Sequence, residues 1–414
     1  MKKTLFSLLA ILSLAFAMPM QAKKHTVKTG IEVLRDQNFK ILEGKRVGLI
    51  TNPTGVDSKL KSTVDILFDA PNVNLVALYG PEHGVRGDIH AGDKVGGSVD
   101  AKTGLPVHSL YGKTRKPTPE MLEDVDVLVY DIQDIGCRSF TFISTMGLAM
   151  EACAENGKEF VVLDRPNPIG GNRIEGNIVE EGFFSFVSQF PIPYLYGLTC
   201  GELAHMINQE KGMIKKSCDL TVIDMKGWKR KMTFMDTNLP WVISSPHIPH
   251  AHSSFFYPTS GILGELGFLS IGVGYTLPFE IFAKDSIDAA KLCDAMNAHQ
   301  IPGVTFRPLH IKPFYSTGKG EHYEGIQTHI SDYDAAPLSM IQFVLMEELY
   351  KQNPALHTFE KANKERFNMF DKVCGTDKIR KTLTSDLRWE AIQQFWDKDV
   401  ESFRKLSKKY YLYK

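Results

Sequence analysis

Short apolar runs alternate with longer amphipathic stretches over the first half of the chain. Almost wholly apolar segments, typical of strands buried on both faces of a parallel sheet, occupy residues 46–50, 75–79, 125–130 and 160–163. Helical spacing of apolar positions is found in residues 31–39, 58–68 and 141–155. This alternation of strands and helices predicts an α/β fold, a Rossmann-like, doubly wound and mainly parallel sheet.

The pattern changes near residue 240. Residues 245–252 (SPHIPHAH) are rich in proline and histidine, and residues 261–274 are dense in glycine. Beyond them, residues 287–298 have helical spacing, residues 325–331 resemble a strand, and the last sixty residues are mostly helical and charged. We therefore expect a Rossmann-like catalytic domain over residues 23–240 and a smaller α/β (α+β) auxiliary domain over residues 241–414.

Two local signals complete the expected elements. Thr199, followed three positions later by Glu202, has the spacing of a capping box and predicts a helix over residues 199–208. Residues 86–112 are rich in glycine and aspartate, with little periodicity, and are expected to form a long loop over the strand ends.

The first 22 residues are typical of a secretory signal peptide. Lys2 and Lys3 precede an apolar stretch over residues 5–17, and Met20-Gln21-Ala22 has the small residue required at a cleavage site. The apolar stretch is shorter than the ~20 residues of a spanning helix, and no later segment is long enough. We expect an exported, periplasmic or secreted protein that is not a lipoprotein, because no cysteine follows the cleavage site.

Charge and cysteine content narrow the possible partners. Lysine plus arginine equal aspartate plus glutamate at 48 each, without a basic block, which argues against nucleic acid. No G-x-G-x-x-G or Walker motif follows a strand, so we expect no nucleotide cofactor. The six widely spaced cysteines have no zinc-ribbon spacing, and we expect mostly buried thiols: Cys137, Cys153, Cys200, Cys218, Cys293 and Cys374.

Polar side chains follow each predicted strand at its carboxyl end, where open α/β sheets bind ligands. In chain order they are Asn52, Glu82, His83, Asp131, Gln133, Asp134, Asp164, Arg165 and Asn167. Several carboxylates and amides with an arginine suit acid–base hydrolysis of a polyhydroxylated substrate, for example a glycoside. Glu82, which follows an apolar strand and Pro81, is the best candidate for the general acid.

Structural roles compete with these chemical ones. Asp131 and Asp134 are equally consistent with turn capping, and Asp164 with Arg165 could form a structural ion pair. Zinc ligation is a further alternative for the histidines His83, His90, His247, His250 and His252. Their spacing matches no helical H-E-x-x-H, and prolines interrupt the second group, so we expect loop histidines and no metal. A serine nucleophile is not favoured, because there is no G-x-S-x-G elbow.

Eight stretches, in order and together covering the chain after residue 22, resemble one family. They are GLITNPTG (48–55), YGPEHGVRG (79–87), VYDIQDIGCRSFTF (129–142), LDRPNPIGG (163–171), EGN (175–177), YGLTCGELA (196–204), YEGIQ (323–327) and the final YYLYK. In these the chain is similar to the NamZ-type exo-β-N-acetylmuramidases, glycoside hydrolase family 171.

The resemblance implies a Rossmann-like domain with an auxiliary domain and an active site in the cleft between them. It implies release of terminal N-acetylmuramic acid, or a related amino sugar, from the non-reducing end of peptidoglycan fragments. Glu82 corresponds to the family's proposed catalytic carboxylate, and Asp131, Asp134 and Glu175 are candidates for a second group by position only.

The expected substrate-contacting residues are Asn52, His83, Arg86, Gln133, Arg138, Asp164, Arg165, Asn167, Glu175, His247 and Glu265. We further expect Arg138 or Arg165 to pair with the lactyl carboxylate of a muramic residue, because a guanidinium fork matches a carboxylate.

The chain departs from the family pattern on one side of the expected pocket. His247 stands where the family has asparagine, and Val273 and Phe268 replace an arginine and an asparagine. These changes leave open a glycan-binding paralogue without catalysis, and the histidine clusters leave open a metal-dependent hydrolase. The oligomeric state and the stereochemical outcome do not follow from the sequence.

Overall fold

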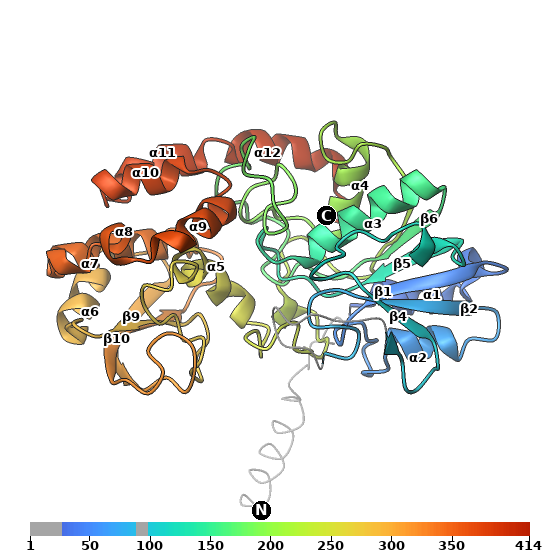
Figure 1. Ribbon diagram of the computed structural model, residues 1–414, viewed down its shortest axis with the longest axis horizontal. Coiled ribbons are helices and arrows are strands. Elements are labelled where there is room, and N and C mark those ends of the chain that lie inside the picture. Colours follow the sequence, from blue (N-terminus) through green and yellow to red (C-terminus); the bar gives the residue numbers. More distant parts are fainter. Residues whose placement is uncertain (1–26, 88–97) are drawn as a thin grey trace, which may run out of the picture.

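The computed structural model describes residues 27–87 and 98–414, so the predicted signal peptide lies outside the described residues. The chain forms a larger domain around one sheet and a smaller domain around a second (Figure 1). Within the described ranges, no helix has the length and apolar character needed to cross a membrane.

The larger domain contains a seven-stranded sheet in the order β3-β4-β2-β1-β5-β6-β7. Its strands are β1 Arg46–Thr51, β2 Asn74–Gly80, β3 Ser98–Val99, β4 Pro106–Ser109, β5 Val127–Asp131, β6 Glu159–Leu163 and β7 Asp219–Ile223. All neighbours are parallel except β3 and β4, and Val47 of β1 pairs with Leu75 on one side and Val127 on the other. The predicted mainly parallel α/β sheet is confirmed.

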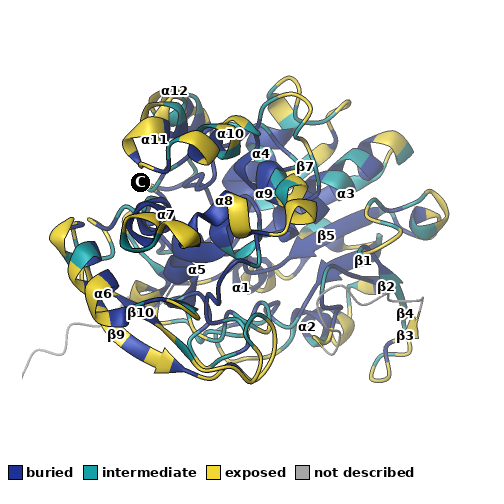
Figure 2. Ribbon diagram, turned by 60° about the vertical axis from the view of Figure 1, so that its left-hand side comes forward, coloured by how far each residue is buried: buried dark blue, intermediate teal, exposed yellow. Residues whose placement is uncertain are grey.

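Helices cover both faces of this sheet, which explains why its strands are apolar at consecutive positions. Val47, Leu49 and Val129 pack in one core with α1 (Gly30–Asp36) and α2 (Thr63–Phe68). Leu128 and Tyr130 point to the opposite core, beneath α3 (Phe142–Asn156) and α4 (Cys200–Gln209). Figure 2 shows the buried strands between these layers.

The smaller domain has a three-stranded antiparallel sheet in the order β8-β10-β9, formed by β8 Ile281–Lys284, β9 Val304–Ile311 and β10 Tyr323–Ile330. Its helices are α5 Ser253–Gly264, α6 Ala289–Ala298, α7 Ile341–Gln352, α8 Thr358–Lys361, α9 Phe367–Cys374, α10 Lys378–Ser385 and α11 Glu390–Asp397. Helices and sheet share one large apolar core.

The end of the chain returns to the larger domain. Helix α12 (Val400–Ser407) and the short 3-10 turn Lys408–Tyr410 place Phe403 and Tyr410 in the core beneath α3 and α4. Tyr413 packs with Trp228 in a separate small cluster, and its hydroxyl donates a 2.6 Å hydrogen bond to Asp164 Oδ2. Figure 1 shows α12 extending from the smaller domain toward α4.

Several expected elements are confirmed and others were missed. The capping box of Thr199 and Glu202 is present at α4, whereas the helix expected over residues 58–68 begins only at Thr63, after its N-cap Ser62. Strand β4 lies within the segment expected to be a loop; it is only four residues long and begins with proline. Helix α5 was missed because it contains Pro258 together with serine and glycine, which have low helix propensity.

The six cysteines are free and buried. The prediction of buried thiols is therefore confirmed.

Candidate active site

Glu82 lies just beyond the carboxyl end of β2, which ends at Gly80. Its half-buried carboxylate accepts a 2.8 Å hydrogen bond from the Thr141 hydroxyl at the N-cap position of α3. Tyr111 lies beside it, since burial and then the Glu82 carboxylate raise the pKa of the Tyr111 phenol. Glu82 is thus held by hydroxyl groups, which leaves its carboxylate free of any ion pair among the described residues.

The smaller domain contributes Tyr257 and Glu265, at the middle and the C-cap of α5. The Tyr257 hydroxyl lies 3.1 Å from Ser139 Oγ of the larger domain. Burial raises the pKa of Tyr257, and the nearby acidic groups of Cys137, Glu265 and Glu82 add to this effect. Tyr257 is therefore within electrostatic range of both glutamates.

The carboxyl of Glu265 differs in character from that of Glu82. Burial raises the pKa of Glu265, and the nearby Arg366 opposes this shift only in part. A carboxyl that resists ionisation is suited to give a proton to a leaving oxygen. The interface therefore brings together two carboxyl groups and a phenol.

His83 and His247 extend this group. His83 is buried and has a left-handed backbone conformation (φ 73°), which is uncommon outside glycine and often occurs at functional sites. Burial and the neighbouring His83 lower the pKa of His247. The Nε2 atom of His247 lies 2.7 Å from the hydroxyl of Tyr315 in the smaller domain.

Asp131 and Arg165 form a buried ion pair. Arg165 donates from Nε to Oδ1 at 2.5 Å and from Nη2 to Oδ2 at 2.9 Å, and Thr63 donates to the same Oδ2. Neither side chain is more than 5% exposed. Asp131 is therefore paired on both oxygens and wholly buried, away from any substrate, which disagrees with its expected catalytic role.

Arg138 is fully buried, and its two terminal nitrogens donate to the backbone carbonyls of Asn177, Ile192 and Val373. This geometry disagrees with the expectation that Arg138 or Arg165 meets a lactyl carboxylate. Both side chains are buried and donate to protein groups from distant segments, although Arg138 Nε has no partner among the described residues.

The remaining strand-end residues mainly fix loops. Asp134 accepts hydrogen bonds from Gly136 N and Tyr196, and burial raises its pKa to about 6. Asp164 binds the start of α4 through Gly201 N and Thr199, and burial raises its pKa to about 7.

The three expected amides bind backbone or neighbouring loop groups. Asn52 accepts from Thr54, Gln133 donates to the carbonyls of residues 134 and 166, and Asn167 donates to Leu198 O. None of these bonds involves Glu82, so the amides stabilise the strand-end loops.

Two further candidates also have protein partners. Arg86 forms a bidentate pair with Asp100 at 2.9 and 3.0 Å. Glu175 accepts from Arg173, Leu338 N and Ser339, so it connects the larger domain to the smaller one.

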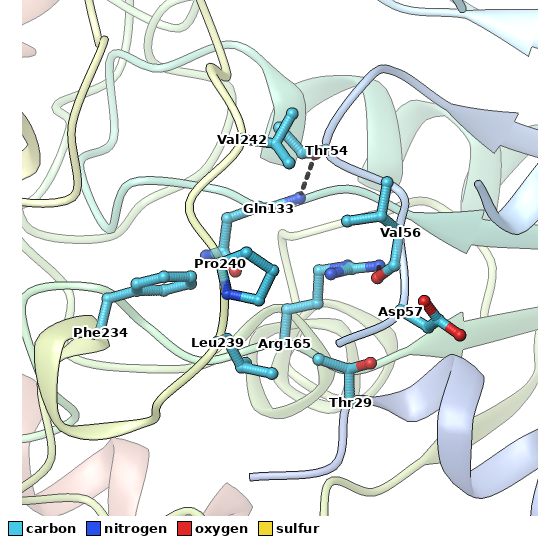
Figure 3. A pocket seen from close by; sticks show the side chains of 10 residues that line it. All are labelled: Thr29, Thr54, Val56, Asp57, Gln133, Arg165, Phe234, Leu239, Pro240 and Val242. Carbon is cyan, nitrogen blue, oxygen red and sulfur yellow. Dashed lines mark hydrogen bonds between the residues drawn. The ribbon is translucent and has the colours of Figure 1, made fainter. Parts of the chain in front are cut away.

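The strand order reverses between β1 and β5, the place where an open α/β sheet usually binds its ligand. Here the space is nearly closed: Gln133 and Arg165 face Leu239 and Pro240 of the connecting segment (Figure 3). The remaining cavity of about 20 Å³ holds a water molecule but no sugar ring. The candidate site is therefore displaced to the end of the neighbouring strand β2.

The described histidines among those considered as zinc ligands are not arranged as a metal-binding group. Among residues 27–87 and 98–414, no three His, Cys, Asp or Glu side chains are placed to hold a metal ion. His90 lies outside the described residues. His250 and His252 stack on each other, with ring centroids 5.1 Å apart.

Thr141, Ser139, Tyr111, Tyr257 and Tyr315 were not among the expected site residues. Ser139 and Thr141 belong to the 129–142 stretch that carries the family resemblance, which was the available signal. The three tyrosines lie in segments without regular periodicity, and only the fold brings them near Glu82 and His83.

A parallel α/β domain and an auxiliary domain that present two glutamates at their interface have the carboxyl groups that hydrolysis of a glycosidic bond requires. Family models for the N-terminal and C-terminal parts of the exo-β-N-acetylmuramidase NamZ match residues 47–252 and 255–413. The chain belongs to the NamZ family and is an exo-acting glycoside hydrolase.

Similar proteins support this assignment. The chain is 45% identical, over the full length of both, to the peptidoglycan β-N-acetylmuramidase NamZ of Bacillus subtilis (strain 168). It also resembles the crystal structures of two DUF1343 family proteins from Bacteroides fragilis NCTC 9343. One is 66% identical with a TM-score of 0.91, and 94% of this chain matches its full length. The other is 29% identical with a TM-score of 0.74, and the match covers 94% of this chain and 99% of that one.

Proposed function

We propose that this chain releases terminal N-acetylmuramic acid from the non-reducing end of peptidoglycan fragments, with Glu82 as a catalytic carboxylate. The assignment of Glu82 rests on the exposure and the hydrogen-bond partners of its carboxyl group, compared with those of the nearby aspartates. Asp131 and Asp164 have buried partners on both oxygens and Asp134 is itself buried, with partners on Oδ1, whereas Glu82 is half-buried, binds only hydroxyl-bearing side chains among the described residues, and faces the smaller domain.

Glu265 is the proposed second carboxyl group. Its raised pKa suits protonation of the leaving oxygen, so we assign to Glu265 the general-acid role that the sequence suggested for Glu82, and we propose that Glu82 faces the anomeric carbon, where positive charge develops. The 2-acetamido group of the sugar can itself supply the nucleophile in such reactions. Tyr257, in electrostatic range of both glutamates, orients the pair.

The test is sugar release by purified protein. The substrates are a chromogenic β-N-acetylmuramide and a muramic-terminated disaccharide, with N-acetylglucosamine counterparts as controls. Glu82→Gln should abolish release while unfolding and binding stay unchanged, and Glu123→Gln, an exposed position on the same domain, should keep full activity. Release that persists in Glu82→Gln would exclude Glu82. Binding without release by the wild type would instead indicate a glycan-binding paralogue.

The amino-terminal pattern supports export to the periplasm or medium. The two lysines, the apolar stretch and Ala22 have the pattern of a signal sequence, and we propose that they direct export. Amino-terminal sequencing of protein secreted by cells expressing the full chain should begin at Lys23. A cytoplasmic product that retains Met1 would contradict export.

A further inference from the structure

The connection between β9 and β10 exposes two large aromatic side chains. Phe314 is 64% and Tyr315 is 48% exposed, although apolar residues of this size are usually buried. Tyr275 stacks on Phe314 with ring centroids 5.7 Å apart and an interplanar angle of 22°. Tyr275 and Phe314, which we call the aromatic ledge, form one wall of a groove of about 480 Å³, and Tyr315 follows Phe314 in the chain without lining the groove.

The ledge has a fixed shape. Phe314 N donates to Gly274 O at 2.8 Å, and Gly320 N donates to Pro313 O at 2.9 Å. Gly274 has a positive φ of 95°, and a Cβ atom there would lie 1.9 Å from Tyr315 O, so only glycine permits this close approach. Because the rings are already positioned, a ligand would not have to order them on binding.

The rest of the groove is mainly polar. His310, Lys312, His322 and Glu324 line it together with Ile311 and Tyr323, and His310 Nδ1 lies 3.8 Å from Glu324 Oε1. Flat aromatic faces next to separate hydrogen-bonding groups suit a ligand with alternating apolar and hydroxyl surfaces, as in a pyranose ring.

Tyr315, the residue after Phe314, links the segment that carries the groove to the candidate active site. Its hydroxyl lies 2.7 Å from His247 Nε2, and His83, which lowers the pKa of His247 after the larger effect of burial, immediately follows Glu82. An exo-acting enzyme holds the terminal sugar at its catalytic carboxylates. The remaining sugars of the glycan must therefore extend away from the active site in one direction.

We propose that this groove is a subsite for the sugars that follow the terminal residue, with Phe314 as the stacking platform. The proposal rests on the function assigned above. It adds that the enzyme prefers oligosaccharides to glycosides of a single sugar.

The test compares Phe314→Ala with wild type on two substrates, a chromogenic β-N-acetylmuramide and a muramic-terminated tetrasaccharide. Loss of one stacked ring should lower kcat/KM on the tetrasaccharide roughly three- to tenfold and leave the chromogenic substrate unchanged. Phe314→Tyr should behave as wild type because it keeps the ring. Phe68→Ala removes a phenylalanine that is 45% exposed on α2 of the other domain, and should have no effect.

Equal losses on both substrates, or no loss on either, would overturn the subsite. Calorimetric titration of the tetrasaccharide into Glu82→Gln and into Glu82→Gln/Phe314→Ala tests it without catalysis. The double variant should bind about three- to tenfold more weakly. If the wild type released no sugar, the function would fail, but this titration would still decide whether the groove binds the chain.

Discussion

Thr141 donates a 2.8 Å hydrogen bond to Glu82 across 59 residues of sequence. This bond joins the end of β2 to the start of α3 and fixes one oxygen of the proposed catalytic carboxylate. We predict that Thr141→Val lowers kcat about tenfold, because a hydrogen bond to a charged group contributes about 1.5 kcal/mol or more. Steady-state kinetics would show this. Thr145→Val, the same change one helical turn away, should keep normal kcat, and equal effects would mean that only packing in α3 was disturbed.

The Asp131–Arg165 pair is predicted to support stability rather than chemistry. Asp131→Ala leaves a buried guanidinium without its counter-ion and should lower the free energy of unfolding by about 3–5 kcal/mol. Urea unfolding measures this loss. Asp126→Ala, which breaks a half-exposed pair with Arg46, should cost far less. If Asp131→Ala had the wild-type free energy of unfolding but no activity, Asp131 would have to be assigned a catalytic role.

Asp134 should make the protein less stable as the pH rises. Burial raises its pKa from 3.8 to about 6, so the folded protein holds a proton that the unfolded chain has already released between these values. Its stabilising contribution is complete below about pH 3.8 and is lost as the pH rises through about 6, a change of about 3 kcal/mol.

Urea unfolding of wild type and Asp134→Asn from pH 4 to pH 7.5 would measure this difference. The free energy of unfolding of the variant should lack this part of the decrease with pH, because asparagine does not titrate. A parallel pH dependence in both proteins would contradict the assignment.

Tyr413→Phe should destabilise the larger domain. It removes the hydroxyl that donates to Asp164 Oδ2, and a buried acceptor that loses a partner costs about 1–3 kcal/mol. Thermal and urea unfolding would register the loss. Tyr411→Phe is the matched control, because the Tyr411 hydroxyl makes only a 3.4 Å contact with Ser407. Equal stability of the two variants would argue against this connection.

The fold of the larger domain could be predicted because its strands are apolar on both faces and its helices have clear periodicity. The run before Gly80 and the capping box at Thr199 each determine local structure from neighbouring residues. Strand β4 and helix α5 could not be found in this way, because tertiary packing overrides the low propensity of Pro106 and Pro258 for these positions.

The site was predictable only in part, for a related reason. The position of Glu82 after a buried strand follows from the sequence pattern. Whether a carboxylate is already paired inside the protein depends, however, on partners that are distant in sequence. Asp131 looks as available as Glu82 until Arg165 and Thr63 are placed beside it. Similarly, Tyr257 and Glu265 reach the interface only because α5 packs against the larger domain.

The return of the chain's end to the larger domain has a consequence for biosynthesis. Asp164 and Glu202 are made well before Tyr413 and Leu412, the residues that donate hydrogen bonds to them. Until residues 412 and 413 have docked, each of these two buried carboxyl groups lacks one hydrogen-bond partner. The larger domain therefore reaches its full stability only with a segment that follows the smaller domain in the chain.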